Sequence, residues 1–275
     1  MRDSDSRTGT ERFEVVSRDG TVVRGVHRPG PGETVVLVHG IAMDHRIWWE
    51  SGFLDGLPGA HIVALDLRGR GDSPHVGTPE GHGMARYVDD LRAVLDRFGQ
   101  ERYTLVGTYF GGRLALHVAA ADTRVTRVLS FCAHGEGVDI PPGAVEDEAS
   151  AIEGPDGQTY LRDHFTKAGA PPWMVDACDR VDRGELAAAT RGLLHGSHHQ
   201  AERGRPEQDL VLITSASDTE METFRASEKR LGARLLLVES PTRVQAAAHL
   251  GDVGRQVAEL LGPAGDVADG GTRPR

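Results

Sequence analysis

Four short stretches of the sequence hold residues whose types and order could perform chemistry. The first, His39-Gly40-Ile41, follows an apolar run and begins a turn whose backbone N–H groups could hold an oxyanion. The second spans residues 107–111 and has the G-x-S-x-G spacing of a nucleophile elbow, but its central residue is Tyr109. The last two are an acid, Asp218, and a histidine, His249, each placed just after another apolar run.

Apolar runs that alternate with helix-period segments must position these residues. We predict strands at 13–17, 21–27, 34–39, 61–66, 103–108, 127–132, 210–215 and 234–239. The later runs are apolar almost throughout, which is typical of strands buried on both faces of a parallel sheet. Helical periodicity is found at 84–98, 110–121, 219–231 and 252–261. This alternation predicts an α/β protein with a mostly parallel, eight-stranded sheet flanked by helices, whose first two strands are antiparallel.

One long segment, residues 134–208, breaks the alternation because it is rich in Gly, Pro and charge and holds no convincing strand. It is too long for a loop, so we predict a helical cap inserted over one end of the sheet, with helices around 158–167, 173–182 and 185–195. The core would then comprise residues 11–133 and 209–262. The polar ends, 1–10 and 263–275, are predicted to be disordered tails.

The C-terminal ends of parallel strands meet at one edge of a sheet. The elbow, the acid and the histidine follow different strands in that order, so we expect them to converge there. Taken alone, an Asp at a strand end is usually an N-cap, and a lone His is usually a bystander.

The chain resembles α/β-hydrolase-fold proteins with a cap, over roughly residues 11–262. The resemblance rests on H-G-x-x-x-D-x-x-x-W at 39–48, on residues 66–73, which resemble D-x-R-G-x-G-x-S, and on the elbow. It implies that the N–H groups of Ile41 and Phe110 are the oxyanion donors. It also implies that Asp218 is the triad acid and His249 the triad base, and it places the nucleophile position on Tyr109.

A tyrosine at the elbow changes the expected mechanism. Its hydroxyl would lie several ångströms beyond a serine oxygen, and a phenol is a weak nucleophile at neutral pH but a good hydrogen-bond donor. Three hypotheses remain open. The chain could be an atypical hydrolase in which His249 activates water, or a non-hydrolytic cyclase, lyase or isomerase with His249 as base and Tyr109 as acid or orienting donor. It could also be a pseudoenzyme that binds a ligand under the cap.

Other residues could contact a substrate. Trp48 matches a family position and could pack or reach the pocket, His134 could line the pocket, and Trp173 could cover the substrate or anchor the cap to the core. Arg68 and Arg70 are expected to brace loops through Asp66 and Asp72 rather than bind an anion.

Composition limits the partners of the chain. Against 31 Lys and Arg residues stand 41 Asp and Glu, a net charge of −10 without a basic run, which disfavours nucleic acid. No apolar stretch suits a membrane span, no signal peptide is evident, and 2 cysteines fit a reduced cytoplasmic setting. The His-rich stretch 195–199 is expected to be an exposed loop rather than a metal site, and no cofactor motif is present. We therefore expect a cofactor-independent enzyme that acts on a small molecule. The Arg-rich, Lys-poor composition favours an origin in a high-GC bacterium. Analogy with capped members of the family in such bacteria then favours a role in tailoring secondary metabolites.

Overall fold

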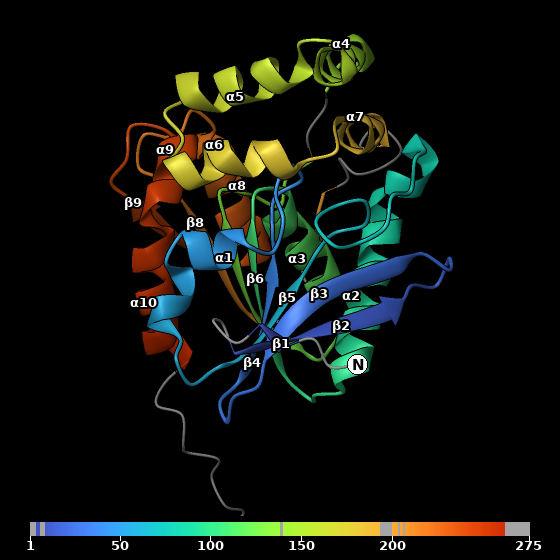
Figure 1. Cartoon of the computed structure of the whole chain (residues 1–275). Helices are drawn as coiled ribbons and strands as arrows, with labels where there is room; N and C mark the ends of the chain where they lie inside the picture. The colour runs from blue at the N-terminus through green and yellow to red at the C-terminus, as the bar shows by residue number, and fades with distance from the viewer. Residues whose placement is uncertain are drawn as a thin grey trace, which may run out of the picture.

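The fold is built on a single sheet whose central strands are parallel (Figure 1). The structure is a computed structural model that describes residues 4–5, 9–137, 140–192, 200–202, 204–205 and 207–261. The strand order is β1-β2-β3-β5-β4-β6-β7-β8-β9, in which β1 to β3 are antiparallel to their neighbours and the remaining pairs are parallel. The strands are β1 (Ser4–Asp5), β2 (Thr10–Val16), β3 (Val22–Arg28), β4 (Thr34–Val38), β5 (His61–Leu65), β6 (Tyr103–Thr108), β7 (Val125–Phe131), β8 (Asp209–Ser215) and β9 (Arg234–Val238).

The predicted parallel sheet flanked by helices is confirmed, and each predicted strand has a counterpart in the structure. Strands β4 and β6 are buried along their whole length, as the continuous apolar runs indicated. One strand was missed, because residues 1–10 were expected to be a disordered tail. Ser4 pairs with Glu11 and Asp5 with Thr10 through the main chain, and such pairing requires no apolar side chain. The expected tail 263–275 lies outside the described residues.

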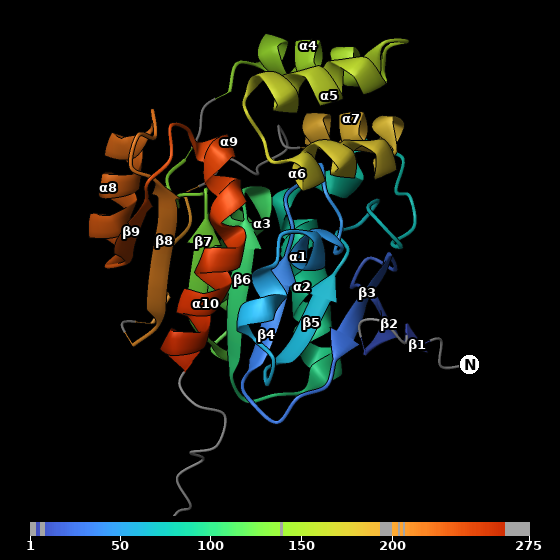
Figure 2. The same ribbon diagram turned by 60° about the vertical axis from the view of Figure 1, so that its left-hand side comes forward.

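Helices cover both faces of the sheet (Figure 2). On one face, α2 (Met84–Phe98), α3 (Phe110–Ala121) and α8 (Met221–Leu231) pack into an apolar core that includes Leu91, Leu114 and Phe224. On the other face, α1 (Ile47–Glu50), η1 (Phe53–Gly56) and α10 (Leu250–Leu261) pack into a second core. The shorter elements are η2 (Pro79–His82), α9 (Arg243–Ala246) and η4 (Ala247–His249). None of the described helices is long and apolar enough to cross a bilayer.

Between β7 and β8, the described residues form four helices that lie beyond the C-terminal ends of the strands (Figures 1 and 2). They are α4 (Pro142–Glu153), α5 (Gly157–Lys167), α6 (Pro172–Ala177), which continues into η3 (Cys178–Arg180), and α7 (Arg183–Gly192). We call residues 142–192 the α4–α7 layer. Helix α4 was not predicted, although its buried side chains Val145, Ala149 and Ile152 follow helical spacing.

Candidate active site

Tyr109 occupies a strained turn between β6 and α3. Its backbone has φ 52° and ψ −118°, a left-handed conformation that costs roughly 1–3 kcal/mol for a residue with a side chain. The neighbouring glycines let the turn pack closely. A Cβ at Gly107 would lie 2.3 Å from the carbonyl carbon of Gly111, and a Cβ at Gly111 would lie 2.1 Å from the carbonyl oxygen of Val38. The sharp strand–turn–helix predicted from the glycine spacing is therefore present.

The hydroxyl of Tyr109 points to the main chain at the start of α9, the short helix that follows β9. It donates to the carbonyl oxygen of Arg243 at 3.3 Å, and the thiol of Cys132 donates to the same oxygen at 3.3 Å. Burial raises the pKa of Tyr109 well above its ordinary value, and the adjacent Cys132 raises it further. Burial likewise raises the pKa of Cys132. Both groups are therefore neutral at physiological pH and act as donors rather than as nucleophiles.

The predicted Asp218–His249 pair is not formed, because Arg243 holds the carboxylate of Asp218. Its Nε and Nη2 atoms each donate to one carboxylate oxygen at 2.9 Å, and Nη2 also lies 2.6 Å from Glu220 Oε2. The Asp218 side chain is fully buried and also accepts from the hydroxyl of Thr214. Burial by itself raises the pKa of Asp218, but the hydrogen bonds from Arg243 and Thr214 outweigh it and hold the pKa below its ordinary value.

His249 lies at the surface instead. Its side chain is 40% exposed, and Nδ1 lies 3.4 Å from Asp252 Oδ2, one helical turn along the chain. Here η4 runs directly into α10, and the ring lines an open groove of about 530 Å³ between β9 and α10. His249 therefore does not pair with Asp218 in this structure, and its assignment as the base stays a prediction. Arg243, which sequence reasoning missed, takes the place facing the acid. The sequence feature that could have identified Arg243 is its position at the start of the first helix after the last strand.

The predicted oxyanion donors are the backbone N–H groups of Ile41 and Phe110, in the two loops next to Tyr109. Phe110 is the first residue of α3, so its N–H has no acceptor inside the helix. The Gly40–Ile41 peptide is fixed by His39, whose Nδ1–H donates to Gly40 O at 2.8 Å while its Nε2 accepts the Leu67 N–H at 3.0 Å. Because the C=O and N–H of a trans peptide point in opposite directions, this contact aims the Ile41 N–H away from His39. A Cβ on Gly40 would lie only 3.6 Å from Thr108 O, so the two loops are adjacent.

Two of the three residues predicted to contact a substrate are buried in this structure. Trp48 has no exposed surface and packs edge-to-face on Phe53, so it cannot touch a ligand in this structure. His134 is buried, with Nε2 3.2 Å from Glu220 Oε2 and Nδ1 accepting the Glu136 N–H at 3.2 Å. Burial lowers the pKa of His134. With both ring nitrogens engaged, it extends the network Asp218–Arg243–Glu220 rather than lining a pocket.

Trp173 on α6 is half-buried and packs against the same apolar core as Tyr109 and Trp49. Its predicted contact with a substrate stays a prediction. Arg68 and Arg70 do brace loops, but through other partners than expected. Arg68 pairs with Asp90 and Asp19, and Arg70 donates to main-chain carbonyls.

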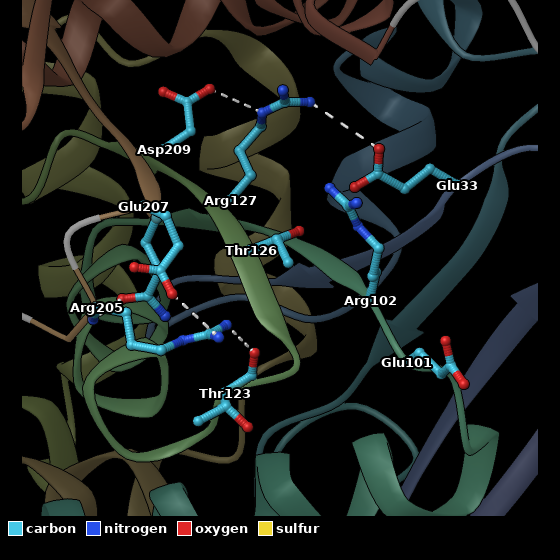
Figure 3. A pocket seen from close by; sticks show the side chains of 10 residues that line it. Glu33, Glu101, Arg102, Thr123, Thr126, Arg127, Arg205, Glu207 and Asp209 are labelled. Atoms are coloured by element: carbon cyan, nitrogen blue, oxygen red, sulfur yellow. Dashed lines mark hydrogen bonds and ion pairs between the residues drawn. The ribbon is translucent and has the colours of Figure 1, made fainter. Parts of the chain in front are cut away.

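A second cavity lies near the opposite ends of the strands (Figure 3). It measures about 480 Å³ and is lined by charged side chains from the segments that precede β4, β6 and β8 and from β7. Arg127, which lines this cavity, lies 2.9 Å from Asp209 and 4.0 Å from Glu33. Its positive charge is therefore paired within the protein. None of the predicted site residues is there. Within the described part of the chain no group of His, Cys, Asp and Glu side chains could hold a metal ion, and the His-rich stretch 195–199 falls outside that part.

Comparisons with known proteins agree with this architecture. The profile of the α/β hydrolase fold family matches residues 33–166. The structure of the bottromycin epimerase BotH, in complex with bottromycin A2, is 67% identical, with a TM-score of 0.90 over 91% of this chain and 99% of that chain. An esterase from Exiguobacterium antarcticum is 17% identical with a TM-score of 0.76 over 90% of this chain and 98% of that one, a likeness that shows the fold alone.

Curated relatives match shorter regions. The dihydrolipoyllysine-residue acetyltransferase component of an acetoin cleaving system from Cupriavidus necator is 28% identical over 74% of this chain and 55% of its own length. A 2-hydroxy-6-oxo-2,4-heptadienoate hydrolase from Pseudomonas putida is 30% identical over 45% of this chain and 46% of its own length. The chain thus spans about half the length of the curated relatives that it matches.

Proposed function

The chain belongs to the α/β-hydrolase fold superfamily, and we propose that it is a cofactor-independent epimerase of a peptide natural product of the bottromycin class. Its likeness to the bottromycin epimerase, at 67% identity over 91% of the chain, supports the substrate class. The observation that supports the reaction type is the pair Tyr109 and Arg243: the first is at the tip of the turn between β6 and α3, and the second binds the carboxylate of Asp218.

Hydrolysis through this pair is disfavoured by its chemistry. A neutral phenol that donates to a main-chain carbonyl is a poor nucleophile, and an arginine side chain stays protonated and cannot accept a proton. The hydrolytic alternative needs His249 next to the elbow, whereas its ring contacts Asp252 at the surface. Epimerisation needs no covalent intermediate and therefore tolerates the loss of the nucleophile.

The proposed reaction moves one proton. The C–H bond at a stereocentre next to a carbonyl breaks, the electron pair enters an enolate, and a new C–H bond forms on the opposite face. The N–H groups of Ile41 and Phe110 would stabilise the negative charge on the enolate oxygen, as they would in a hydrolase oxyanion hole. Tyr109 and Cys132 are held neutral and Asp218 is paired with Arg243, so this cluster does not accept the proton. The proton would pass to solvent water, and water would return a proton to the opposite face of the enolate.

The α4–α7 layer would act as the cap that recognises the peptide. The half-buried side chains of Trp49, Phe165 and Trp173 pack against the apolar core to which Tyr109 also packs. We propose that Trp173 and Phe165 contact apolar side chains of the peptide, while Tyr109 fills the space that an acyl-enzyme would occupy.

The direct test uses a purified bottromycin-type peptide in each of its two diastereomeric forms. Incubation with the protein should convert either form to the same final ratio, which chromatography resolves, without a change in mass. The variant His249→Ala should behave like the wild type, and boiled protein should leave each form unchanged. Binding without interconversion would favour the pseudoenzyme alternative, and cleavage of the peptide would favour a hydrolase; either result overturns the proposal.

A further inference from the structure

We propose that Glu185, on α7 of the α4–α7 layer, is a positioning residue that fixes the two backbone N–H donors of Ile41 and Phe110. The inference rests on the proposed function for its catalytic consequence, but its structural part can be tested without turnover. Glu185 is far from the elbow in the sequence, but its contacts lead to both of the loops that carry these N–H groups.

Glu185 is built into the junction between α7 and the core. It is 3% exposed, and its carboxylate accepts hydrogen bonds from the N–H groups of Val76 and Gly77. The junction leaves no spare space, because a Cβ on Gly69 would lie 2.8 Å from Glu185 Oε2. The backbone N–H of Glu185 donates to Asp182 Oδ1 at 2.8 Å, which fixes the start of α7.

The first connection reaches Ile41 through Arg70. The Arg70 side chain is buried, donates from Nε to Ile41 O at 2.5 Å, and lies with Nη2 3.5 Å from the carbonyl oxygen of Glu185. Burial lowers the pKa of Arg70, and the nearby Tyr87 and Glu185 raise it in part. Arg70 also donates to Gly69 O, so its buried guanidinium links the main chain of Glu185 to the Ile41 loop.

The second connection reaches Phe110 through His82 and Tyr87. Glu185 Oε2 lies 3.4 Å from His82 Nε2, and His82 Nδ1 is 2.8 Å from the hydroxyl of Tyr87. The Tyr87 ring packs edge-to-face on Phe110, with centroids 4.9 Å apart. All of these intermediate side chains are fully buried, so a shift at Glu185 cannot be absorbed by solvent.

Replacing the carboxylate would loosen both connections. Glu185→Gln keeps one carbonyl oxygen for the N–H groups of Val76 and Gly77 but removes a negative charge near the buried Arg70, which itself contacts the main-chain carbonyl of Glu185. Loss of a nearby negative charge disfavours a buried cation, and the amide cannot keep every carboxylate contact of the junction, so the Arg70 side chain and the Ile41 carbonyl would shift. Displacement of a donor by about 1 Å is enough to lower a rate by about 100-fold.

The experiment compares Glu185→Gln with a matched control, Glu146→Gln, on α4. Glu146 also belongs to the α4–α7 layer and pairs with Arg191, but its side chain is 58% exposed. Hydrogen exchange followed by mass spectrometry should show faster exchange at residues 39–43 and 109–112 in Glu185→Gln only. With the peptide substrate, kcat should fall about 10- to 100-fold in Glu185→Gln while KM changes little.

A second variant separates the two connections and serves if Glu185→Gln does not fold. Arg70→Lys keeps the charge but loses the donor to Ile41 O, so exchange should rise at residues 39–43 and stay unchanged at 109–112. If the folded Glu185→Gln variant keeps wild-type exchange at both segments, or if Arg70→Lys leaves residues 39–43 protected, the inference fails. If exchange changes as expected in Glu185→Gln but the wild-type protein does not epimerise the peptide, the proposed function fails and the positioning role of Glu185 stands.

Discussion

The guanidinium of Arg243 donates to both carboxylate oxygens of Asp218, at 2.9 Å each. In a Ser–His–Asp hydrolase the acid would orient a histidine, which would activate the serine. Here Arg243 fills the position facing Asp218, and its main-chain carbonyl accepts the hydroxyl of Tyr109. Tyr109, Arg243 and Asp218 are therefore joined by hydrogen bonds, one to the next. Neither tyrosine nor arginine is suited to the role that acyl transfer would need at its position.

This arrangement predicts that hydrolysis can be restored by two substitutions. The double variant Tyr109→Ser, Arg243→His should hydrolyse p-nitrophenyl acetate at least about 100-fold faster than either single variant, the scale expected for a positioned base. Adding Asp218→Asn should remove most of the gain. A folded double variant that stays as inactive as the single variants would show that position 243 does not face the elbow in the required geometry.

The surface position of His249 predicts a silent substitution. His249→Ala removes a half-exposed contact with Asp252, so the free energy of unfolding should change by less than about 0.5 kcal/mol. Epimerisation of the peptide should proceed at the wild-type rate. Loss of turnover in a stable His249→Ala variant would restore this residue as a candidate base and refute the site described above.

The hydroxyl of Tyr109 is expected to contribute little to turnover. Tyr109→Phe removes one hydrogen bond of 3.3 Å to Arg243 O, which is worth about 1 kcal/mol, so kcat should stay within about fivefold of the wild type. Thermal unfolding supplies the matching stability measurement. A much larger fall in kcat with unchanged stability would mean that the phenol acts as an acid in the reaction.

His82 predicts a pH dependence of stability. Burial and the nearby charge of Arg70 lower its pKa from 6.5 to about 4. The unfolded chain therefore binds the proton first as the pH falls, and stability that is present above pH 6.5 is lost down to about pH 4, by roughly 3 kcal/mol. Urea unfolding across this range should show a smaller loss for His82→Asn than for the wild type. The exposed-site control His75→Asn should keep the wild-type slope; an equal slope in all three proteins would exclude His82 as the cause.

The sequence allowed much of the fold to be predicted, because its strands are apolar nearly throughout. Strand β6 and helices α2 and α3 have the predicted bounds. Tyr109 was placed on the elbow because Gly107 and Gly111 define a crossing that few other spacings permit. The strand β1 was not foreseen, since its pairing with β2 uses only main-chain groups.

The partner of Asp218 could not be chosen from chain order alone. Thr242 caps α9 by accepting the Gln245 N–H, so a helix begins at Arg243 and brings that residue to the acid. His249 comes nearly two turns later and falls on the outer side. The pattern Thr-x-x-Gln was a readable start signal for this helix. Glu185 carried no comparable signal, because its partners at 70, 76 and 82 are about a hundred residues away and meet it only in the folded chain.

An epimerase moves a proton on carbon and does not cleave its substrate. The most direct measurement is mass spectrometry of a bottromycin-type peptide after incubation with the protein in D₂O. The inverted diastereomer should carry one deuteron at the inverted carbon, and the peptide should stay intact. A peptide heavier by one water, or inverted product that retains its original hydrogen, would rule out epimerisation through an enolate.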